Sequence, residues 1–150
     1  MFFIVAAKPQ KGELMKGPPL VIVIEDDSEH QNLIRRGIGG LYSLVFAEDI
    51  PESIELFNAT LIDKSKHDDV LAIIFDGGLY SHGAFNTGGL VQTVVEIHGF
   101  SAATIAYSAS HNDKLLAAGC RYSVSKGKIR ILTCLLEFLT ATKQQEGLAV

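Results

Sequence analysis

Cysteine and positive charge are both scarce in this sequence, and each shortage excludes a kind of protein. Only two of the 150 residues are cysteines, Cys120 and Cys134, which is too few for a disulfide scaffold, and they lack the spacing of metal ligands. The formal net charge of −4 leaves no basic stripe that could neutralise a nucleic-acid backbone. We therefore expect both cysteines to be small core residues in a reducing compartment, and no direct binding to nucleic acid.

Long apolar runs are also absent. The first run, Phe2–Ala7, is far shorter than the roughly 20 residues of a membrane-spanning helix, and no basic segment precedes it as in a signal peptide. We therefore expect a cytoplasmic protein without membrane contact.

Residues 1–18 are predicted to form an N-terminal arm, because prolines and glycines are frequent between Lys8 and Pro19. The apolar patch Phe2–Val5 can pack on the domain, join a homodimer or stay disordered, and the sequence does not rank these alternatives. The domain proper then covers residues 19–145, and residues 146–150 form a tail. A chain of this length supports one domain with a sizeable core.

Within the domain, short apolar stretches alternate with helical patterns. Leu20–Ile24 and Val70–Phe75 are unbroken apolar runs, typical of parallel strands that are buried on both faces. The pattern predicts further strands at 44–47, 103–108 and 122–125, and helices over about 28–37, 51–61, 90–97, 115–117 and 129–144. This alternation predicts an α/β domain with a parallel sheet and helices on both faces.

Local signals mark where the helices begin. Ser28 and Gln31 fit a capping box, in which their side chains bond to free backbone groups. Asp49 with Pro51 opens the second helix. We expect Ile54 and Ile97 to lie on the apolar stripes of their helices.

Polar side chains stand where the predicted strands end. Glu25-Asp26 follows the first strand, and Asp76 follows the third. Ser108 ends the fourth strand, and Lys126 follows the fifth. Because parallel strands have their carboxyl ends at one edge of the sheet, we expect these groups to converge on a single cleft.

Four segments in this order resemble the receiver domain of two-component response regulators, of the single-domain chemotaxis-regulator type. They are Val23–Asp27, Ile73–Asp76, Ile105–Ala109 and Gly119–Lys126. The resemblance covers about residues 20–145. It implies a flavodoxin-like, doubly wound fold with five parallel strands in the order 2-1-3-4-5, and a signalling domain rather than an enzyme.

The resemblance also implies a reaction and its partners. Asp76 corresponds to the aspartate that accepts a phosphoryl group from a sensor histidine kinase, a phosphotransfer protein or a small phosphodonor. Ser108 would hydrogen-bond one phosphoryl oxygen, and Lys126 would pair with another. The added charge would draw Ser108 inward and change the face that a downstream target protein binds.

A magnesium ion is the implied cofactor. Its ligands would be Glu25, Asp26, Asp76 and the backbone carbonyl of Gly78. The chemistry of the residues agrees, because crowded carboxylates repel one another and Mg²⁺ prefers hard oxygen ligands. Phosphoryl transfer mainly needs positioning and neutralised charge, which a metal, an ammonium and a hydroxyl supply.

The sequence departs from the family pattern in three places. The aromatic residue that the family carries near the fifth strand is Tyr122, one position before the usual site, which is Ser123. Gly127 stands where a cis-proline usually follows the lysine, so we predict a trans Lys126–Gly127 bond and a somewhat displaced ammonium. The glycine-rich loop Gly77–Gly89 is longer than the family's.

Three other functions compete with a phosphorylated receiver. A pseudo-receiver would keep the fold and act as a phosphorylation-independent interaction module, which the departures favour. An aspartyl phosphohydrolase is disfavoured because Gly78 stands where such enzymes carry a second acid. A dinucleotide-binding domain is disfavoured because the first strand runs into acids instead of a glycine fingerprint. Among the histidines, only His82 lies near enough to Asp76 in sequence to be a site candidate.

Overall fold

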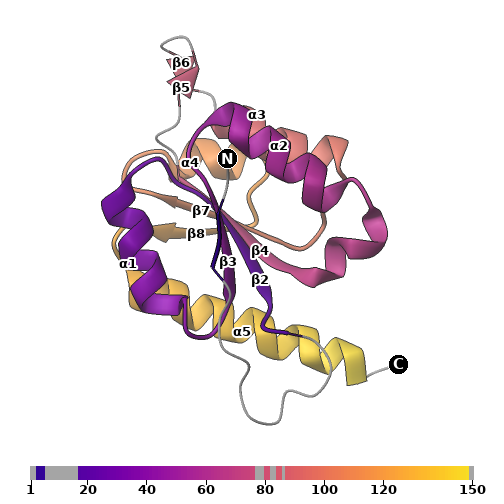
Figure 1. Cartoon of the computed structure of the whole chain (residues 1–150). Helices are drawn as coiled ribbons and strands as arrows, with labels where there is room; N and C mark the ends of the chain where they lie inside the picture. The colour runs from indigo at the N-terminus through magenta and orange to yellow at the C-terminus, as the bar shows by residue number, and fades with distance from the viewer. Residues whose placement is uncertain (1–2, 6–16, 77–79, 82–83, 86, 149–150) are drawn as a thin grey trace.

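The fold is organised around one mixed sheet. The computed structural model describes residues 3–5, 17–76, 80–81, 84–85 and 87–148. The sheet has six strands in the order β1-β3-β2-β4-β7-β8 (Figure 1). Their bounds are β1 Phe3–Val5, β2 Leu20–Ile24, β3 Ser43–Ala47, β4 Val70–Phe75, β7 Ala103–Ser108 and β8 Tyr122–Ser125.

The five predicted strands are all parallel, and their order confirms the expected 2-1-3-4-5 arrangement. The sixth strand was not expected. β1 pairs antiparallel with the outer edge of β3, with Phe3 opposite Phe46 and Val5 opposite Leu44. Part of the predicted arm therefore lies on the domain, where it covers a sheet edge that would otherwise present unpaired backbone groups.

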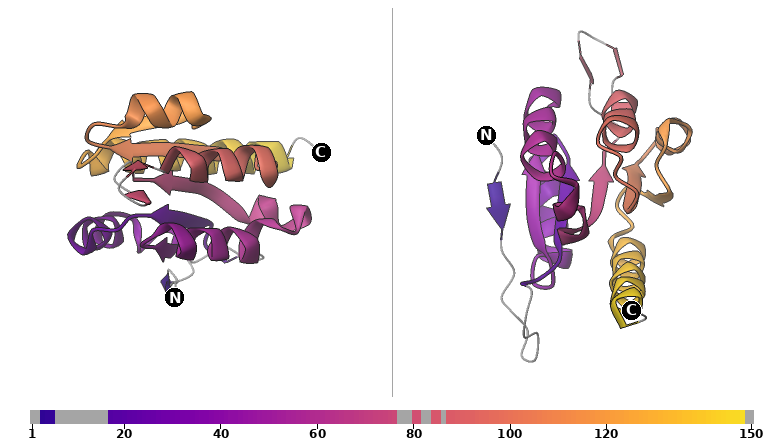
Figure 2. Two further views of the ribbon diagram at one scale, coloured as in Figure 1. Left: turned by 90° about the horizontal axis from the view of Figure 1, so that it is seen from above. Right: turned by 90° about the vertical axis from the view of Figure 1, so that its right-hand side faces the viewer.

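Helices cover both faces of the sheet, as Figure 2 shows. α1 and α5 pack on one face, and α2, α3 and α4 pack on the other. Two irregular helices, η1 and η2, complete the second side. The bounds are α1 Ser28–Ile38, α2 Ile50–Leu61, η1 Lys64–Asp69, α3 Thr87–Gln92, η2 Thr93–Ile97, α4 Asn112–Ala118 and α5 Ile129–Leu148.

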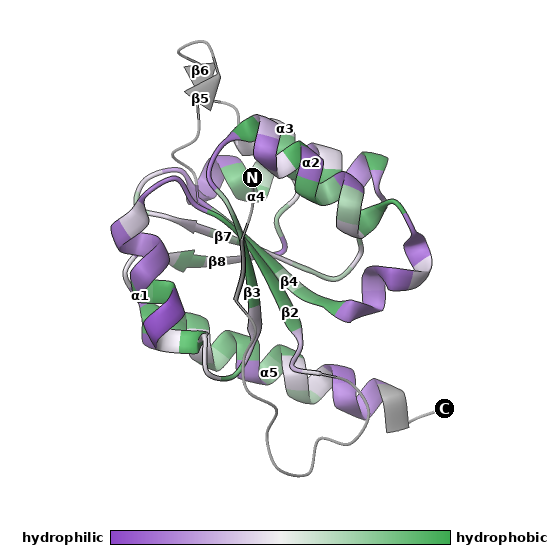
Figure 3. Ribbon diagram, viewed as in Figure 1, coloured by the Kyte–Doolittle hydropathy of each residue, from purple (hydrophilic) through white to green (hydrophobic). Residues whose placement is uncertain are grey.

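Two apolar cores sandwich the sheet. Ile22, Ile73 and Phe75 point into the core under α2 and α3, whereas Val23 and Ile74 point into the core under α1 and α5. β2, β4 and β7 are buried almost along their whole length, which explains why their sequences do not alternate. Figure 3 shows the central strands as the most hydrophobic part of the fold.

The first helix is capped differently from the prediction. Asp27, not Ser28, is the N-cap, and its Oδ1 accepts hydrogen bonds from the backbone N–H groups of Glu29 and His30. Gln31 does not complete a capping box; its Nε2 donates to the carbonyl of Glu25 at 2.7 Å. The side chain of Gln31 therefore joins the first turn of α1 to the end of β2, and the side chain of Asp27 caps the helix. The second helix follows the prediction, with Asp49 as N-cap and a proline in its first turn.

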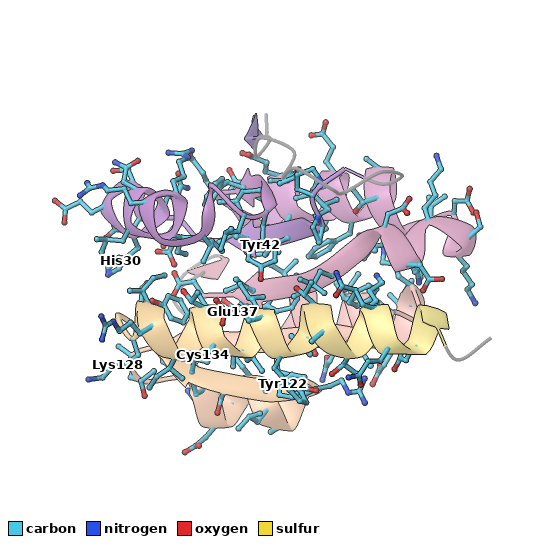
Figure 4. All side chains as sticks on the ribbon, turned by 90° about the horizontal axis from the view of Figure 1, so that it is seen from below. His30, Tyr42, Tyr122, Lys128, Cys134 and Glu137 are labelled. Atoms are coloured by element: carbon cyan, nitrogen blue, oxygen red, sulfur yellow. The ribbon has the colours of Figure 1, made fainter. Side chains whose placement is uncertain are left out.

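Three apolar side chains lie elsewhere than predicted. Ile54 and Ile97 are exposed, at 43% and 75% of their surface. Cys134 is exposed on α5 (Figure 4), so the core prediction holds for Cys120 alone. Spacing alone could not exclude these positions, since each fits a stripe that is wider than the buried face.

The chain leaves the end of β4 through a small hairpin. β5 (Tyr80–Ser81) and β6 (Ala84–Phe85) pair antiparallel, separately from the main sheet, and the hairpin stands beyond the helices in Figure 1. None of the helices within the described residues combines the length and the apolar character that crossing a membrane requires.

Candidate functional site

The sheet brings the polar strand ends together. The backbone N–H of Glu25 donates to Ala47 at 2.9 Å, and that of Asp76 donates to Ile24 at 2.9 Å. Both residues thus continue the hydrogen-bond ladder by one step beyond their apolar strands. Because the ladder fixes their backbones, the two carboxylates emerge side by side at the carboxyl edge of the sheet.

Lys126 joins the two carboxylates. Its Nζ lies 3.0 Å from Oε1 of Glu25 and 3.0 Å from Oδ1 of Asp76. The side chains are 14%, 1% and 4% exposed, respectively. An ammonium that bonds to two buried carboxylates offsets part of the cost of removing those charges from water.

Asp26 completes a cluster of three acids. It offers a carboxylate oxygen that lies within 4.8 Å of oxygens of both Glu25 and Asp76. We call Glu25, Asp26, Asp76 and Lys126 the strand-end cluster. It borders an open cleft of about 450 Å³, whose lining residues are Asp26, Asp27, Asp76, Ser108, Ala109, Ser110, His111 and Lys126.

Three carboxylates and one ammonium leave the cluster with an excess of negative charge. Burial, followed by the charge of Asp76, raises the pKa of Glu25 from 4.5 to about 7. Burial and the neighbouring Asp76 also raise the pKa of Asp26. Burial opposes the charged form of Lys126, but its bonds to Asp76 and Glu25 outweigh this effect and raise the pKa of the amine.

The acids fit a divalent cation with oxygen ligands. Within the described residues, Oε2 of Glu25 is buried and has no hydrogen-bond partner, because Lys126 and the backbone of Asp27 take the other oxygen. An unpartnered buried carboxylate oxygen is costly unless a cation or proton binds it. Carboxylate oxygens are also the ligands that Mg²⁺ and Ca²⁺ prefer. Glu25, Asp26 and Asp76 could therefore hold such an ion.

Ser108 lines the same cleft from the end of β7. Its Oγ accepts hydrogen bonds from the backbone N–H groups of Ser110 at 3.3 Å and His111 at 3.0 Å. These bonds use the oxygen as acceptor and leave the hydroxyl proton for another partner. Ser108 thus holds the turn that leads from β7 to α4.

Asn112 is a supporting residue that the sequence did not single out. Its Oδ1 accepts from the N–H of Ser108 at 2.9 Å, and its Nδ2 donates to the carbonyl of Val124 at 3.1 Å. The side chain therefore joins the carboxyl ends of β7 and β8. An asparagine shortly after a predicted strand indicates that its side chain bonds to nearby backbone groups. Only the fold shows that these groups belong to β7 and β8.

Two of the departures from the family pattern, Gly127 and Tyr122, lie near Lys126 in the chain. The Lys126–Gly127 bond is trans, as predicted, and Gly127 has φ +91°. Its N–H donates to the hydroxyl of Tyr107 at 3.0 Å, a contact the sequence analysis missed. Tyr122, labelled in Figure 4, is half-buried against the core under α1 and α5. Ser123 is exposed, as the alternation of a strand requires.

Two predicted positions lie outside the described residues. They are Gly78, whose backbone carbonyl was expected to be a metal ligand, and His82. The structure therefore brings together Glu25, Asp26, Asp76, Ser108 and Lys126.

Known structures share this fold. No protein-family model and no curated protein matches the sequence. A receiver domain from Methanospirillum hungatei JF-1 is 14% identical, with a TM-score of 0.66, and the match covers 87% of this chain and 99% of that one. The fold is therefore that of response regulator receiver domains of the chemotaxis-regulator type.

Two further similar structures contain ligands. The receiver domain of a sensor histidine kinase from Pseudomonas aeruginosa PAO1, solved with magnesium in its active-site cleft, is 18% identical, with a TM-score of 0.61. That match covers 82% of this chain and 98% of the other. A response regulator from Burkholderia pseudomallei with a phosphorylated aspartic acid and a calcium ion is 14% identical, with a TM-score of 0.62, covering 87% of this chain and 74% of that one.

Proposed function

We propose that this chain is a phosphorylation-dependent signalling domain whose phosphoacceptor is Asp76. The observation that supports this most strongly is the ion-pair geometry of the strand-end cluster, where one ammonium lies 3.0 Å from both Asp76 and Glu25. Asp76 lines an open cleft, so a phosphodonor can approach its carboxylate. The likeness to receiver domains supports the same assignment.

The proposed reaction gives each of these side chains a role. A carboxylate oxygen of Asp76 attacks the phosphorus of the donor, and the bond between phosphorus and the donor's nitrogen or oxygen breaks with its electron pair leaving on the donor. No general base is needed, because a carboxylate nucleophile has no proton to lose when it attacks. Lys126 pairs with one phosphoryl oxygen, and the free hydroxyl proton of Ser108 donates to another.

Glu25, Asp26 and Asp76 would hold Mg²⁺ at this edge, together with the backbone carbonyl of Gly78. The ion would neutralise charge that builds up on the phosphoryl oxygens. The buried, unpartnered Oε2 of Glu25 supports this assignment, as does the magnesium ion in the Pseudomonas receiver domain.

The proposal implies partners on two sides. The phosphodonor is a sensor histidine kinase, a phosphotransfer protein or a small acyl phosphate, and the output is a changed interaction face for a downstream protein in the cytoplasm. The domain acts as a switch, and any catalysis is limited to its own phosphorylation and dephosphorylation.

A pseudo-receiver is the second candidate. Lys126 already neutralises part of the charge of the acids, and the raised pKa of Glu25 lets this residue stay partly protonated near neutral pH. A chain with this charge state could keep its fold without a metal and act through protein contacts alone.

Intact-mass spectrometry separates the two candidates. The chain is incubated with acetyl phosphate, with and without Mg²⁺, and compared with Asp76→Asn. We expect a mass gain of one phosphoryl group that requires both Mg²⁺ and Asp76. An unchanged mass, together with no binding of beryllofluoride, would overturn the proposed function in favour of the pseudo-receiver.

A further inference from the structure

The backbone N–H groups of Lys126 and of the following residue, Gly127, both donate hydrogen bonds to residues of β7. The ladder between β7 and β8 ends with Ser108 opposite Ser125. Beyond it, the N–H of Lys126 donates to the carbonyl of Ser108 at 3.3 Å, and the N–H of Gly127 donates to the hydroxyl of Tyr107 at 3.0 Å. The peptide unit that follows Lys126 is therefore anchored by a side chain instead of by the ladder.

We propose that Tyr107 is a positioning residue that holds Lys126 at the strand-end cluster through this hydrogen bond. The lysine stem has several rotatable bonds, so the position of its backbone decides whether Nζ reaches both Glu25 and Asp76. Fixing the next peptide unit limits where that stem can begin. The consequence for phosphoryl binding rests on the proposed function, whereas the effect on the amine itself does not.

Tyr107 is well placed to act as a rigid anchor. Its ring is buried, with 3% of its surface exposed, in the core under α1 and α5. A buried ring has little freedom, so the hydroxyl at its end stays at a defined point. Burial raises the pKa of this phenol, and the hydrogen bond from the backbone of Gly127 opposes that rise.

Gly127 supplies the matching half of the contact. Its φ of +91° is a conformation that residues with a Cβ rarely adopt, although nothing lies within 4 Å of the point a Cβ would occupy. The requirement is therefore for backbone conformation and not for space. Proline would supply neither this φ nor the N–H group that Tyr107 binds.

The test substitutes Tyr107→Phe, which removes the hydroxyl and keeps the buried ring. The first measurement is the rate at which acetic anhydride modifies the Lys126 amine, relative to Lys114 and Lys128 in the same molecule, by peptide mass spectrometry. We expect Lys126 to react several-fold faster in the variant, because the amine leaves its carboxylate partners more often. Tyr122→Phe, the same change on the neighbouring strand, serves as control and should leave the rate unchanged.

The second measurement is calorimetric binding of Mg²⁺ alone and of beryllofluoride in saturating Mg²⁺. We expect about a tenfold loss of beryllofluoride affinity, the size of one hydrogen bond's effect, with Mg²⁺ affinity within about twofold of the original. A merely structural role would instead lower thermal stability and change both affinities together or neither. An unchanged Lys126 rate with unchanged beryllofluoride affinity would overturn the inference.

The two measurements also separate this inference from the proposed function. If the unsubstituted chain fails to bind beryllofluoride, the proposed function is overturned, while the Lys126 modification rate still decides whether Tyr107 positions the amine. If beryllofluoride binds equally well to both chains and the rates match, the proposed function stands and the role of Tyr107 is rejected.

Discussion

The middles and the carboxyl ends of the central strands are equally buried but chemically opposite. Ile73 in β4 has no exposed surface, and Asp76, one residue beyond the same strand, is only 3% exposed. The strand middles gain stability from apolar burial, whereas the ends bury charges at a cost that Lys126 only partly offsets. The comparison teaches that one strand can both build the core and bury a charged group at its end at a cost in stability.

The largest expected effect comes from a strand middle. Ile73→Ala removes buried methyl and methylene groups and leaves a cavity, which should lower the free energy of unfolding by about 2 to 5 kcal/mol. Urea denaturation measures the loss. The matched control is Ile54→Ala, which truncates an exposed isoleucine and should stay within about 0.5 kcal/mol. Equal losses in both variants would break the comparison, since burial would then not explain the effect.

The next effect is a pH dependence that belongs to the strand ends. Glu25 has a pKa raised from 4.5 to about 7, so between these values the folded chain holds a proton that the unfolded chain has released. The contribution of Glu25 to stability should therefore be greatest below about pH 4.5 and should fall as pH rises to about 7, by about 3 kcal/mol in total.

Urea denaturation at several pH values between about 5 and 8 checks this slope. Glu25→Gln should flatten the dependence, because the amide does not titrate. Saturating Mg²⁺ should also flatten it in the unsubstituted chain, because the ion stabilises the charged carboxylate. A slope that persists in Glu25→Gln would assign the effect to another group.

A smaller effect is expected from the residue that joins the ends of β7 and β8. Asn112→Ala leaves the N–H of Ser108 and the carbonyl of Val124 without their side-chain partner, at a cost of about 1 to 2 kcal/mol. Asn58→Ala, an exposed position on α2, is the control and should be nearly neutral. A loss of beryllofluoride affinity in Asn112→Ala alone would support a separate role for the strand ends. Unchanged affinity in both variants would contradict it.

The smallest effect belongs to one hydroxyl. Ser108→Ala removes the acceptor for the N–H groups of Ser110 and His111 and should cost about 0.5 to 1 kcal/mol. Ser108→Thr keeps the hydroxyl and should restore both stability and the phosphorylation rate with acetyl phosphate. If Ser108→Ala is phosphorylated as fast as the original chain, the hydroxyl only stabilises the turn between β7 and α4.

The sequence predicted the structure best for the strands of the buried sheet. β7 and β8 have the bounds that the alternation of strand and helix patterns predicted. The strand order agrees with the one implied by the resemblance to receiver domains. The convergence of Glu25, Asp76 and Lys126 follows from that order, since parallel strands share one edge. Asp27, and not Ser28, is the N-cap of α1. This depends on the residue at which the chain turns away from β2 into the helix, which the local sequence does not indicate.

Contacts between distant segments were the least predictable. The hydrogen bond between Gly127 and Tyr107 joins residues that are 20 positions apart. It also depends on a positive φ angle, which glycine can adopt but which the presence of a glycine does not predict. The pairing of β1 with β3 is similar, because a short apolar segment fits a sheet edge, an interface or neither equally well.

That edge pairing has a practical consequence for anyone who shortens the chain. A protein started at Pro18 would lack β1, and the amide and carbonyl groups of β3 that now pair with Phe3–Val5 would face water. Such a row of unsatisfied groups recruits extended segments from neighbouring molecules, so a trimmed version should self-associate at high concentration. Light scattering of the trimmed and untrimmed proteins at matched concentration would reveal it.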